Sequence, residues 1–153
     1  MKLLHQMNPK RVGFIRNHLC KHFNLDPYSP KPLQGLKILD VGCGAGLLAE
    51  VCYTYNIPKQ GIKVDINTFQ SLARLGATVT GIDAAEPNIA AARAHHERAG
   101  AHGDHVTYEH GTAEALKVRV GAAYDVVCCL EVLEHVKSVD LLLDSLQDLV
   151  KVR

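Results

Sequence analysis

Residues 37–46 read Lys-Ile-Leu-Asp-Val-Gly-Cys-Gly-Ala-Gly. The first half is a short apolar run, which predicts a buried strand over Lys37–Val41. The second half has glycine at every other position, which predicts a tight turn leading into a helix that starts at Leu47. Glycine has no Cβ, so the turn can adopt positive φ angles and another molecule can lie against its backbone. The segment therefore predicts a strand–turn–helix unit whose backbone another molecule can approach closely.

The rest of the chain continues the alternation of strands and helices. Short apolar runs predict strands, whereas helical spacing, with proline at the start or glycine past the end, predicts helices. The predicted strands are Thr78–Asp83, Val106–Glu109 and Tyr124–Leu130, and the predicted helices are Asn8–Phe23, Asn88–Ala99 and Val139–Val150. This order predicts an α/β fold with a parallel sheet, with no helix predicted between the third and fourth strands.

Composition narrows the class of protein. The chain has 153 residues, a formal net charge of +1 and 47% hydrophobic residues, which fit one globular domain with one core. The near-neutral charge argues against a dedicated nucleic-acid binder, and no apolar run is long enough to cross a membrane. Five cysteines without a C-x-x-C pair indicate a reducing compartment rather than a disulfide framework.

The glycine turn fits several classes of ligand, and two details narrow them. The dinucleotide fingerprint G-x-G-x-x-G requires glycine at position 47, where this chain has Leu47. Asp40 precedes the turn, and a carboxylate there disfavours a phosphate but could orient the amino group of a zwitterionic ligand through water. Gly42 and Gly44 would let that ligand lie against the backbone. The alternative is a tight turn that binds nothing.

Asp83 is the second candidate for ligand binding. It ends the second predicted strand, where an acid can accept hydrogen bonds from both hydroxyls of a ribose. The alternative is that Asp83 caps a helix or shapes a turn.

The third candidate is Glu131-Val132-Leu133-Glu134-His135, directly after the fourth predicted strand. In a helix or turn, Glu131, Glu134 and His135 would share one face, because residues three and four apart are neighbours there. Two carboxylates and an imidazole suit a divalent cation or a general base with an orienting partner. The alternative is a solvated helix start, where acidic residues favour the helix dipole. Spacing alone leaves these alternatives open.

Four blocks of the chain resemble a known family. They are Met7–Ile15, Leu36–Glu50, Leu72–Asp83 and Tyr124–Val136, in this order. These blocks look like those of the ubiquinone-biosynthesis O-methyltransferases, which are class I S-adenosylmethionine (SAM) methyltransferases. The glycine turn and Asp83 are shared by class I methyltransferases in general, whereas the Asn-Pro-x-Arg and Glu-x-x-Glu-His segments point to this family. The resemblance implies a Rossmann-like class I methyltransferase fold.

The resemblance implies roles for four residues in binding SAM. Arg11 would approach the carboxylate of the methionine part, and Gly42 would lie along the backbone side of the ligand. Asp83 would bind the ribose, and Leu130 would lie beside the adenosine.

The resemblance also implies a metal and a substrate. Glu131, Glu134 and His135 match the positions that the family assigns to Mg²⁺, and Glu131 or His135 would take the proton of the acceptor hydroxyl. The implied substrate is a polyprenylated catechol-type small molecule of ubiquinone biosynthesis, with no nucleic-acid partner. The resemblance further implies a ubiquinone-biosynthesis complex and peripheral contact with a membrane as partners. The implied location is the matrix face of the mitochondrial inner membrane for a eukaryotic source, and the cytoplasm otherwise.

The chain departs from the family's pattern between the first two predicted strands. Asp83 lies 41 positions after Gly42, and removing the 20 residues from Val51 to Gln70 leaves 21, the spacing expected of a ribose-binding acid. We therefore expect an insertion at 51–70 within a SAM-binding domain at 36–153, preceded by a helix and a proline-rich linker at 1–35.

The ends of the chain also differ from the family's pattern. We expect a partial sheet containing the first four of seven strands, with the later strands and part of the acceptor pocket missing. An exposed fourth strand would then favour association with other chains. Two functions therefore remain open, a SAM-dependent O-methyltransferase and a catalytically inactive SAM- or nucleotide-binding fragment or interaction module.

The insertion leads to a prediction for hydrogen exchange. Leu47, Leu48, Val51 and Tyr55 keep a helical apolar face, so the helix after the glycine turn should persist into the insertion. We expect slow amide exchange over Gly42–Tyr55 as well as over Ile38–Val41. Protection confined to Ile38–Val41 would contradict this expectation.

Overall fold

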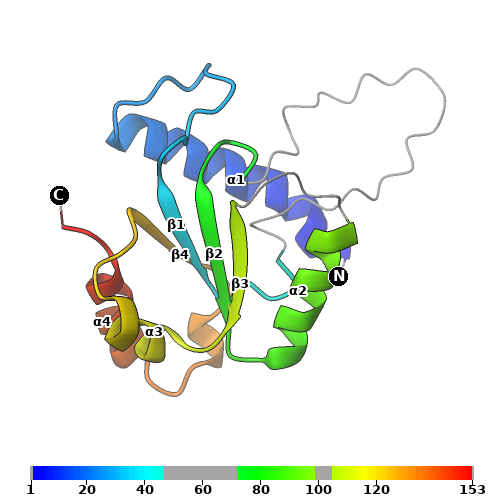
Figure 1. The fold of residues 1–153 in the computed structure, drawn as a ribbon, viewed down its shortest axis with the longest axis vertical. Helices are drawn as coiled ribbons and strands as arrows, with labels where there is room; N and C mark the ends of the chain where they lie inside the picture. The colour runs from blue at the N-terminus through cyan, green and yellow to red at the C-terminus, as the bar shows by residue number, and fades with distance from the viewer. Residues whose placement is uncertain (1, 47–71, 99–104, 153) are drawn as a thin grey trace.

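The computed structural model describes residues 2–46, 72–98 and 105–152, and Figure 1 shows their arrangement. The insertion predicted at 51–70 lies outside the described residues. One sheet of four parallel strands forms the centre, in the order β3-β2-β1-β4. These strands are β1 (Lys37–Val41), β2 (Thr78–Asp83), β3 (Val106–His110) and β4 (Val126–Cys129). The predicted α/β fold with a parallel sheet is confirmed.

Strand β1 is one of the two interior strands of the sheet. It pairs in parallel with β2 on one side and with β4 on the other, so that Asp40 lies opposite both Gly81 and Cys128. All four strands therefore end at the same edge of the sheet. The chain leaves β1 toward β2 but later crosses to β4 on its other side, and this reversal of strand order opens a crevice beyond the strand ends.

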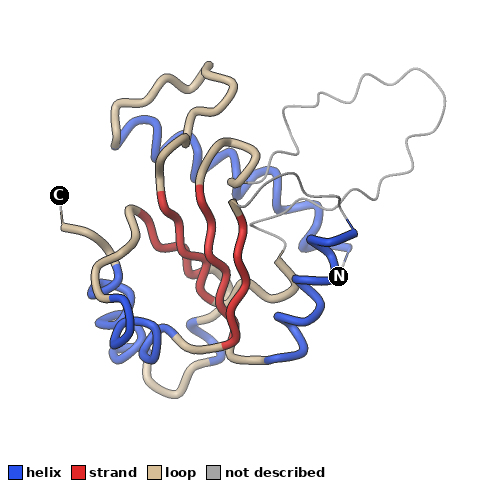
Figure 2. Tube along the Cα trace, viewed as in Figure 1, coloured by secondary structure: helices blue, strands red, loops and turns tan. Residues whose placement is uncertain are grey.

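Helices cover both faces of the sheet. Helices α1 (Lys2–His22) and α2 (Glu86–Arg98) lie on one face, and α3 (Ala113–Val120) and α4 (Val139–Leu149) lie on the other (Figure 2). Side chains alternate along β1, so Ile38 packs in the core with α1 and α2, whereas Leu39 packs in the core with α3 and α4. Both are fully buried, as expected of a strand with both faces covered.

Helix α3 was not predicted. The sequence interpretation placed no helix between the third and fourth strands, but parallel strands require a crossover connection, and α3 provides it. The side chain of Thr112 accepts a hydrogen bond from the Ala115 N–H and caps the helix start. Helix α1 also begins earlier than predicted, at Lys2, so Pro9 lies inside the helix, where it cannot donate a helical hydrogen bond.

Asp125 fixes the amino-terminal ends of β1 and β4. Its Oδ2 accepts a hydrogen bond from the Lys37 N–H at 2.8 Å, and its Oδ1 accepts one from Lys151 Nζ at 3.1 Å. A parallel bridge joins Tyr124 and Val150 on the outer side of β4. The residues after α4 therefore cover the amino-terminal end of the strand that was expected to be an exposed edge.

No described helix is long and apolar enough to span a membrane. This finding covers the described ranges alone.

The two faces of the sheet lead to a stability prediction. Replacing the fully buried Leu39 by alanine removes packing on the α3–α4 side and should lower the free energy of unfolding by about 2–5 kcal/mol. Leu141, which is 60% exposed on α4, is the matched control, and its replacement by alanine should change stability by less than about 0.5 kcal/mol. Urea-induced unfolding of both variants measures the difference, and equal losses would contradict the described core.

Candidate functional site

The candidate site lies at the carboxyl-terminal edge of the sheet, beyond the ends of β1, β2 and β4. The glycine turn, residues 42–46, follows β1, and Asp83 ends β2. The segment 130–136 follows β4 and contains a single turn of 3-10 helix, η2 (Leu133–His135). The structure thus brings the three predicted groups to one edge.

The glycine turn has the backbone shape that its sequence predicted. Gly42, Gly44 and Gly46 have φ angles of 74°, 54° and 82°. The N–H groups of Gly42 and Cys43 both donate to the carbonyl oxygen of Ile82, at 2.8 and 3.0 Å. The turn is therefore hydrogen-bonded to the end of β2.

Two of the three glycines also avoid a steric clash. A Cβ on Gly42 would overlap the side chain of Val132, from the segment after β4, and a Cβ on Gly46 would overlap Tyr108 of β3. A Cβ on Gly44 would meet no described atom within 4 Å. Gly44 is therefore the place where the turn presents open backbone.

Asp83 lies directly beneath the turn. Its Oδ2 accepts a hydrogen bond from the Gly44 N–H at 2.9 Å. Its Oδ1 accepts from the Ala85 N–H at 2.8 Å and from Asn88 Nδ2 at 3.1 Å. Asp83 shapes both the glycine turn and the start of α2, so its structural role accompanies any role in binding a ligand.

Asp40 is the buried acid of the site. Its side chain is on the α1 face of β1 and only 3% of the residue is exposed, and Oδ2 has no hydrogen-bond partner among the described residues. Burial, and after it the negative charge of Asp83, raise the pKa of the Asp40 carboxyl to about 7, whereas the positive charge of Arg11 lowers it. A buried carboxylate oxygen without a partner favours a polar ligand at this point.

Arg11 connects the amino-terminal helix to the site. Its guanidinium donates a hydrogen bond to Glu131 Oε1 and forms an ion pair with that carboxylate, although the two residues are 120 positions apart. The Arg11 side chain is 21% exposed and that of Glu131 is 57% exposed. The sequence did not indicate this pair.

Glu131, Glu134 and His135 do not lie together on one helical turn, the arrangement in which their spacing would give them a shared face. Glu131 has a φ of 59°, in the left-handed region, and the helical turn begins only at Leu133. Glu131 also pairs with Arg11. Within the described ranges, no group of three or more histidine, cysteine, aspartate or glutamate side chains is arranged to hold a metal ion. These residues therefore do not form a ready metal site.

Charge favours one kind of ligand at this edge. Asp40, Asp83 and Glu131 supply three carboxyl groups, and Arg11 supplies one guanidinium. Three acidic groups and one basic group favour a ligand with more positive than negative charge, such as one with positively charged groups and a single carboxylate. Leu130 follows β4 directly and is 38% exposed, so it offers an apolar surface beside these groups.

Three residues around the turn were not predicted as part of the site. They are Asn88, whose amide reaches Asp83; His95, whose Nδ1 lies 3.3 Å from the Ala45 carbonyl oxygen; and Tyr108, which packs beneath Gly46. The sequence did contain a signal for Asn88. It is an amide in the first turn of a helix, five positions after the acid that ends the preceding strand. His95 and His96 are both half-buried.

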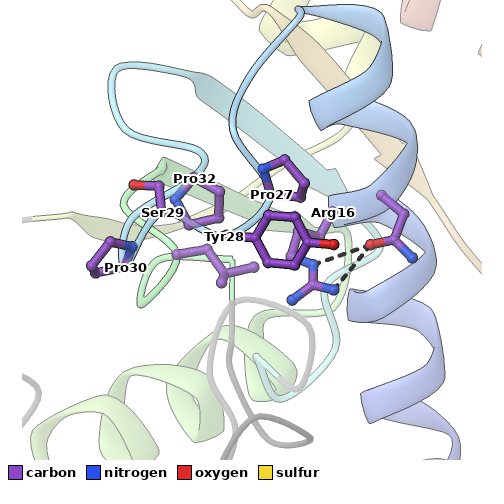
Figure 3. A pocket seen from close by; sticks show the side chains of 8 residues that line it. Arg16, Pro27, Tyr28, Ser29, Pro30 and Pro32 are labelled. Atoms are coloured by element: carbon purple, nitrogen blue, oxygen red, sulfur yellow. Dashed lines mark hydrogen bonds between the residues drawn. The ribbon is translucent and has the colours of Figure 1, made fainter.

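A separate hollow of about 560 Å³ lies elsewhere on the molecule, and Figure 3 shows its lining. It is lined by Arg16 and Asn17 of α1, by five residues of segment 27–32 (all but Lys31) and by Leu75. Segment 27–32 and Leu75 precede β1 and β2, so the hollow is on the amino-terminal side of the sheet. None of the predicted site residues lines it.

Comparison with protein families agrees with this geometry. A family model described as a methyltransferase domain matches residues 14–152. The chain is 40% identical to the ubiquinone biosynthesis O-methyltransferase of Sinorhizobium fredii over 148 residues, which cover 97% of this chain and 50% of the relative. It is 45% identical to the mitochondrial ubiquinone biosynthesis O-methyltransferase of Arabidopsis thaliana over 139 residues, which cover 88% of this chain and 35% of the relative. The chain thus spans half or less of the length of these curated relatives.

Solved structures show the same fold. The magnesium protoporphyrin IX methyltransferase of Synechocystis with bound SAH matches with a TM-score of 0.63 at 24% identity, covering 94% of this chain and 52% of that one. The same enzyme with bound SAM also matches with a TM-score of 0.63. The predicted Rossmann-like methyltransferase fold is therefore confirmed.

Asp40 leads to a pH prediction. The unfolded carboxyl titrates near 3.8 and the folded one near 7, so between these values the folded chain holds a proton that the unfolded chain releases. This group therefore lowers the free energy of unfolding as the pH rises through that window. Asp40→Asn cannot ionise, so its stability should fall less than that of the wild type between about pH 5 and about pH 8.

Urea-induced unfolding at both pH values measures this difference. Asp144→Asn, which changes an exposed carboxyl on α4, is the control and should follow the wild-type curve. Parallel curves for Asp40→Asn and the wild type would contradict the assignment.

Proposed function

This chain belongs to the methyltransferase domain family, and we propose that it provides the SAM-binding part of an O-methyltransferase of ubiquinone biosynthesis. The observation that carries the proposal is the grouping of the glycine turn, Asp83, Asp40 and Arg11 at one end of β1 and β2. The names of the curated relatives support the reaction.

The proposed pose of SAM follows the charges of the site. The methionine carboxylate pairs with Arg11, and the amino group lies toward the unpartnered Oδ2 of Asp40. The backbone at Gly44 gives the ligand close approach, because no described side chain occupies the space above it. The positively charged sulfonium lies among groups whose net charge is negative. The same negative charge would repel the two phosphates of a dinucleotide.

The adenosine end extends along the edge from the end of β2 to the segment after β4. Asp83 accepts hydrogen bonds from ribose hydroxyls, and the half-exposed Leu130 lies along the adenine. The glycine turn already donates to Asp83 through the Gly44 N–H at 2.9 Å. The ribose-binding acid is therefore held in place before the ligand arrives.

The transferred methyl group goes to a hydroxyl of a catechol-type acceptor. The hydroxyl oxygen attacks the methyl carbon as the carbon–sulfur bond breaks, which gives the methyl ether and S-adenosylhomocysteine (SAH), and the proton passes to a base. We assign this base to the segment after β4, which carries Glu131 and His135. Both are exposed and can meet an acceptor that approaches from solvent.

Magnesium enters only as an expectation from the family resemblance. The described residues do not gather the three predicted ligands Glu131, Glu134 and His135, and Glu131 is paired with Arg11. The proposed transfer therefore includes no step through a metal. Turnover that is unchanged in EDTA would support this version of the reaction.

We further propose that the acceptor carries a polyprenyl tail. The protein would then act within a ubiquinone-biosynthesis complex and in contact with a membrane surface. One relative is named as mitochondrial, which supports a mitochondrial location for a eukaryotic source.

The test is ligand binding measured by calorimetry. We expect the full chain to bind SAM and SAH but not NAD, and Asp83→Ala to weaken SAH binding by about tenfold or more, since hydrogen bonds to a charged group contribute about 1.5–3 kcal/mol. Tyr28→Ala, in the hollow on the opposite edge, is the control and should bind SAH as the wild type does.

Methyl transfer from labelled SAM to a catechol completes the test. Turnover supports the O-methyltransferase, whereas SAH binding without turnover identifies a binding module. Preference for NAD over SAH would contradict both functions.

A further inference from the structure

Asp83 has more donors than a ribose-binding acid needs. Among the described residues, three N–H groups donate to its carboxylate, those of Gly44, Ala85 and the Asn88 side chain, at 2.9, 2.8 and 3.1 Å. Two come from the backbone and hold the glycine turn and the start of α2. Only the Asn88 amide comes from a side chain that can rotate.

The number of hydrogen bonds that the Asp83 carboxylate can accept limits how a ribose can bind it. Each carboxylate oxygen accepts about two hydrogen bonds. Oδ2 receives one, from Gly44, and can accept a ribose hydroxyl without any change. Oδ1 receives two, from Ala85 and Asn88, so a second hydroxyl can bind it only if one donor withdraws. The Asn88 amide is the donor that can withdraw.

The backbone of Asn88 keeps this amide at the site. Its N–H donates to the Ala85 carbonyl oxygen at 3.0 Å, in the first turn of α2. The next residue, Ile89, is 1% exposed and anchors the helix in the core. The Asn88 side chain itself is exposed, so it can change its partner without disturbing the packing of α2.

An amide is chemically suited to share a diol with a carboxylate. Asparagine offers N–H donors and a carbonyl acceptor, whereas a carboxylate only accepts. A ribose hydroxyl that donates to Asp83 still has lone pairs, and the Asn88 N–H group can donate to them.

We propose that Asn88 is a second ribose-binding residue, which transfers its hydrogen bond from Asp83 to a ribose hydroxyl when the nucleoside binds. This assignment rests on the proposed SAM site and extends it. It makes the site specific for a nucleoside that carries both ribose hydroxyls.

The experiment compares SAH with its 2′,3′-dideoxy analogue, both measured by calorimetry on the full chain. Asn88→Ala should weaken SAH binding by about 2- to 5-fold, less than the effect of one full hydrogen bond, because the variant also loses the Asn88–Asp83 bond of the free chain. It should change binding of the dideoxy analogue by less than about twofold, because that analogue has no hydroxyl for the amide to contact. Asn88→Asp, which replaces the donor with a charge beside Asp83, should lose at least as much SAH affinity as Asn88→Ala.

A control variant and the fold of the protein are checked in parallel. Glu97→Gln changes an exposed polar side chain near the other end of α2 and should leave both affinities unchanged. Thermal unfolding of Asn88→Ala should show one cooperative transition with at most a small fall in Tm, from the loss of the exposed hydrogen bond to Asp83.

Each remaining outcome overturns a definite part of the account. Equal loss of SAH and of the dideoxy analogue in Asn88→Ala would show that the amide only supports the structure, and no loss of either would show that it has no part in binding. A wild-type chain that fails to bind SAH would overturn the proposed function, and the role of Asn88 with it.

Discussion

The candidate site depends on the hydrogen bonds between the glycine turn and the end of β2. The N–H groups of Gly42 and Cys43 donate to the Ile82 carbonyl oxygen, and that of Gly44 donates to the Asp83 carboxylate. Each such bond contributes about 0.5–1.5 kcal/mol, and more when the acceptor is charged. They hold the turn in positive-φ conformations and bring its open backbone beside the ribose-binding acid. The parallel register of β1 and β2 makes this arrangement possible.

The second constraint is charge. Burial beside Asp83 leaves Asp40 difficult to ionise, and Arg11 is the cation that opposes this effect. A zwitterionic, sulfonium-containing ligand would relieve the imbalance, because its amino group and sulfonium are positive and its carboxylate can pair with Arg11. In the described structure Arg11 is paired with Glu131. The amino-terminal helix and the segment after β4 are therefore linked across the site.

Sequence alone predicted the parts of this structure that have strong local signals. The bounds of β1 and β2 agree with the predicted ones, because short runs rich in isoleucine, valine and threonine give a strong strand signal. Helix α3 was missed because only Ala113 and Leu116 of its eight residues are buried, which gives little helical pattern. The placement of Glu131 could not be predicted from spacing, since its partner lies 120 positions away. The roles of the site residues remain predictions.

The most direct test of the account is an amide nitrogen–proton spectrum of the labelled full chain during titration with SAH. Binding at the strand ends should move the Gly44 and Ala85 signals most, because both N–H groups donate to the carboxylate that would receive the ribose. The signals of Tyr28 and Leu75, which line the hollow on the opposite edge, should stay in place. Shifts confined to Tyr28 and Leu75, or no shifts at saturating SAH, would contradict the account.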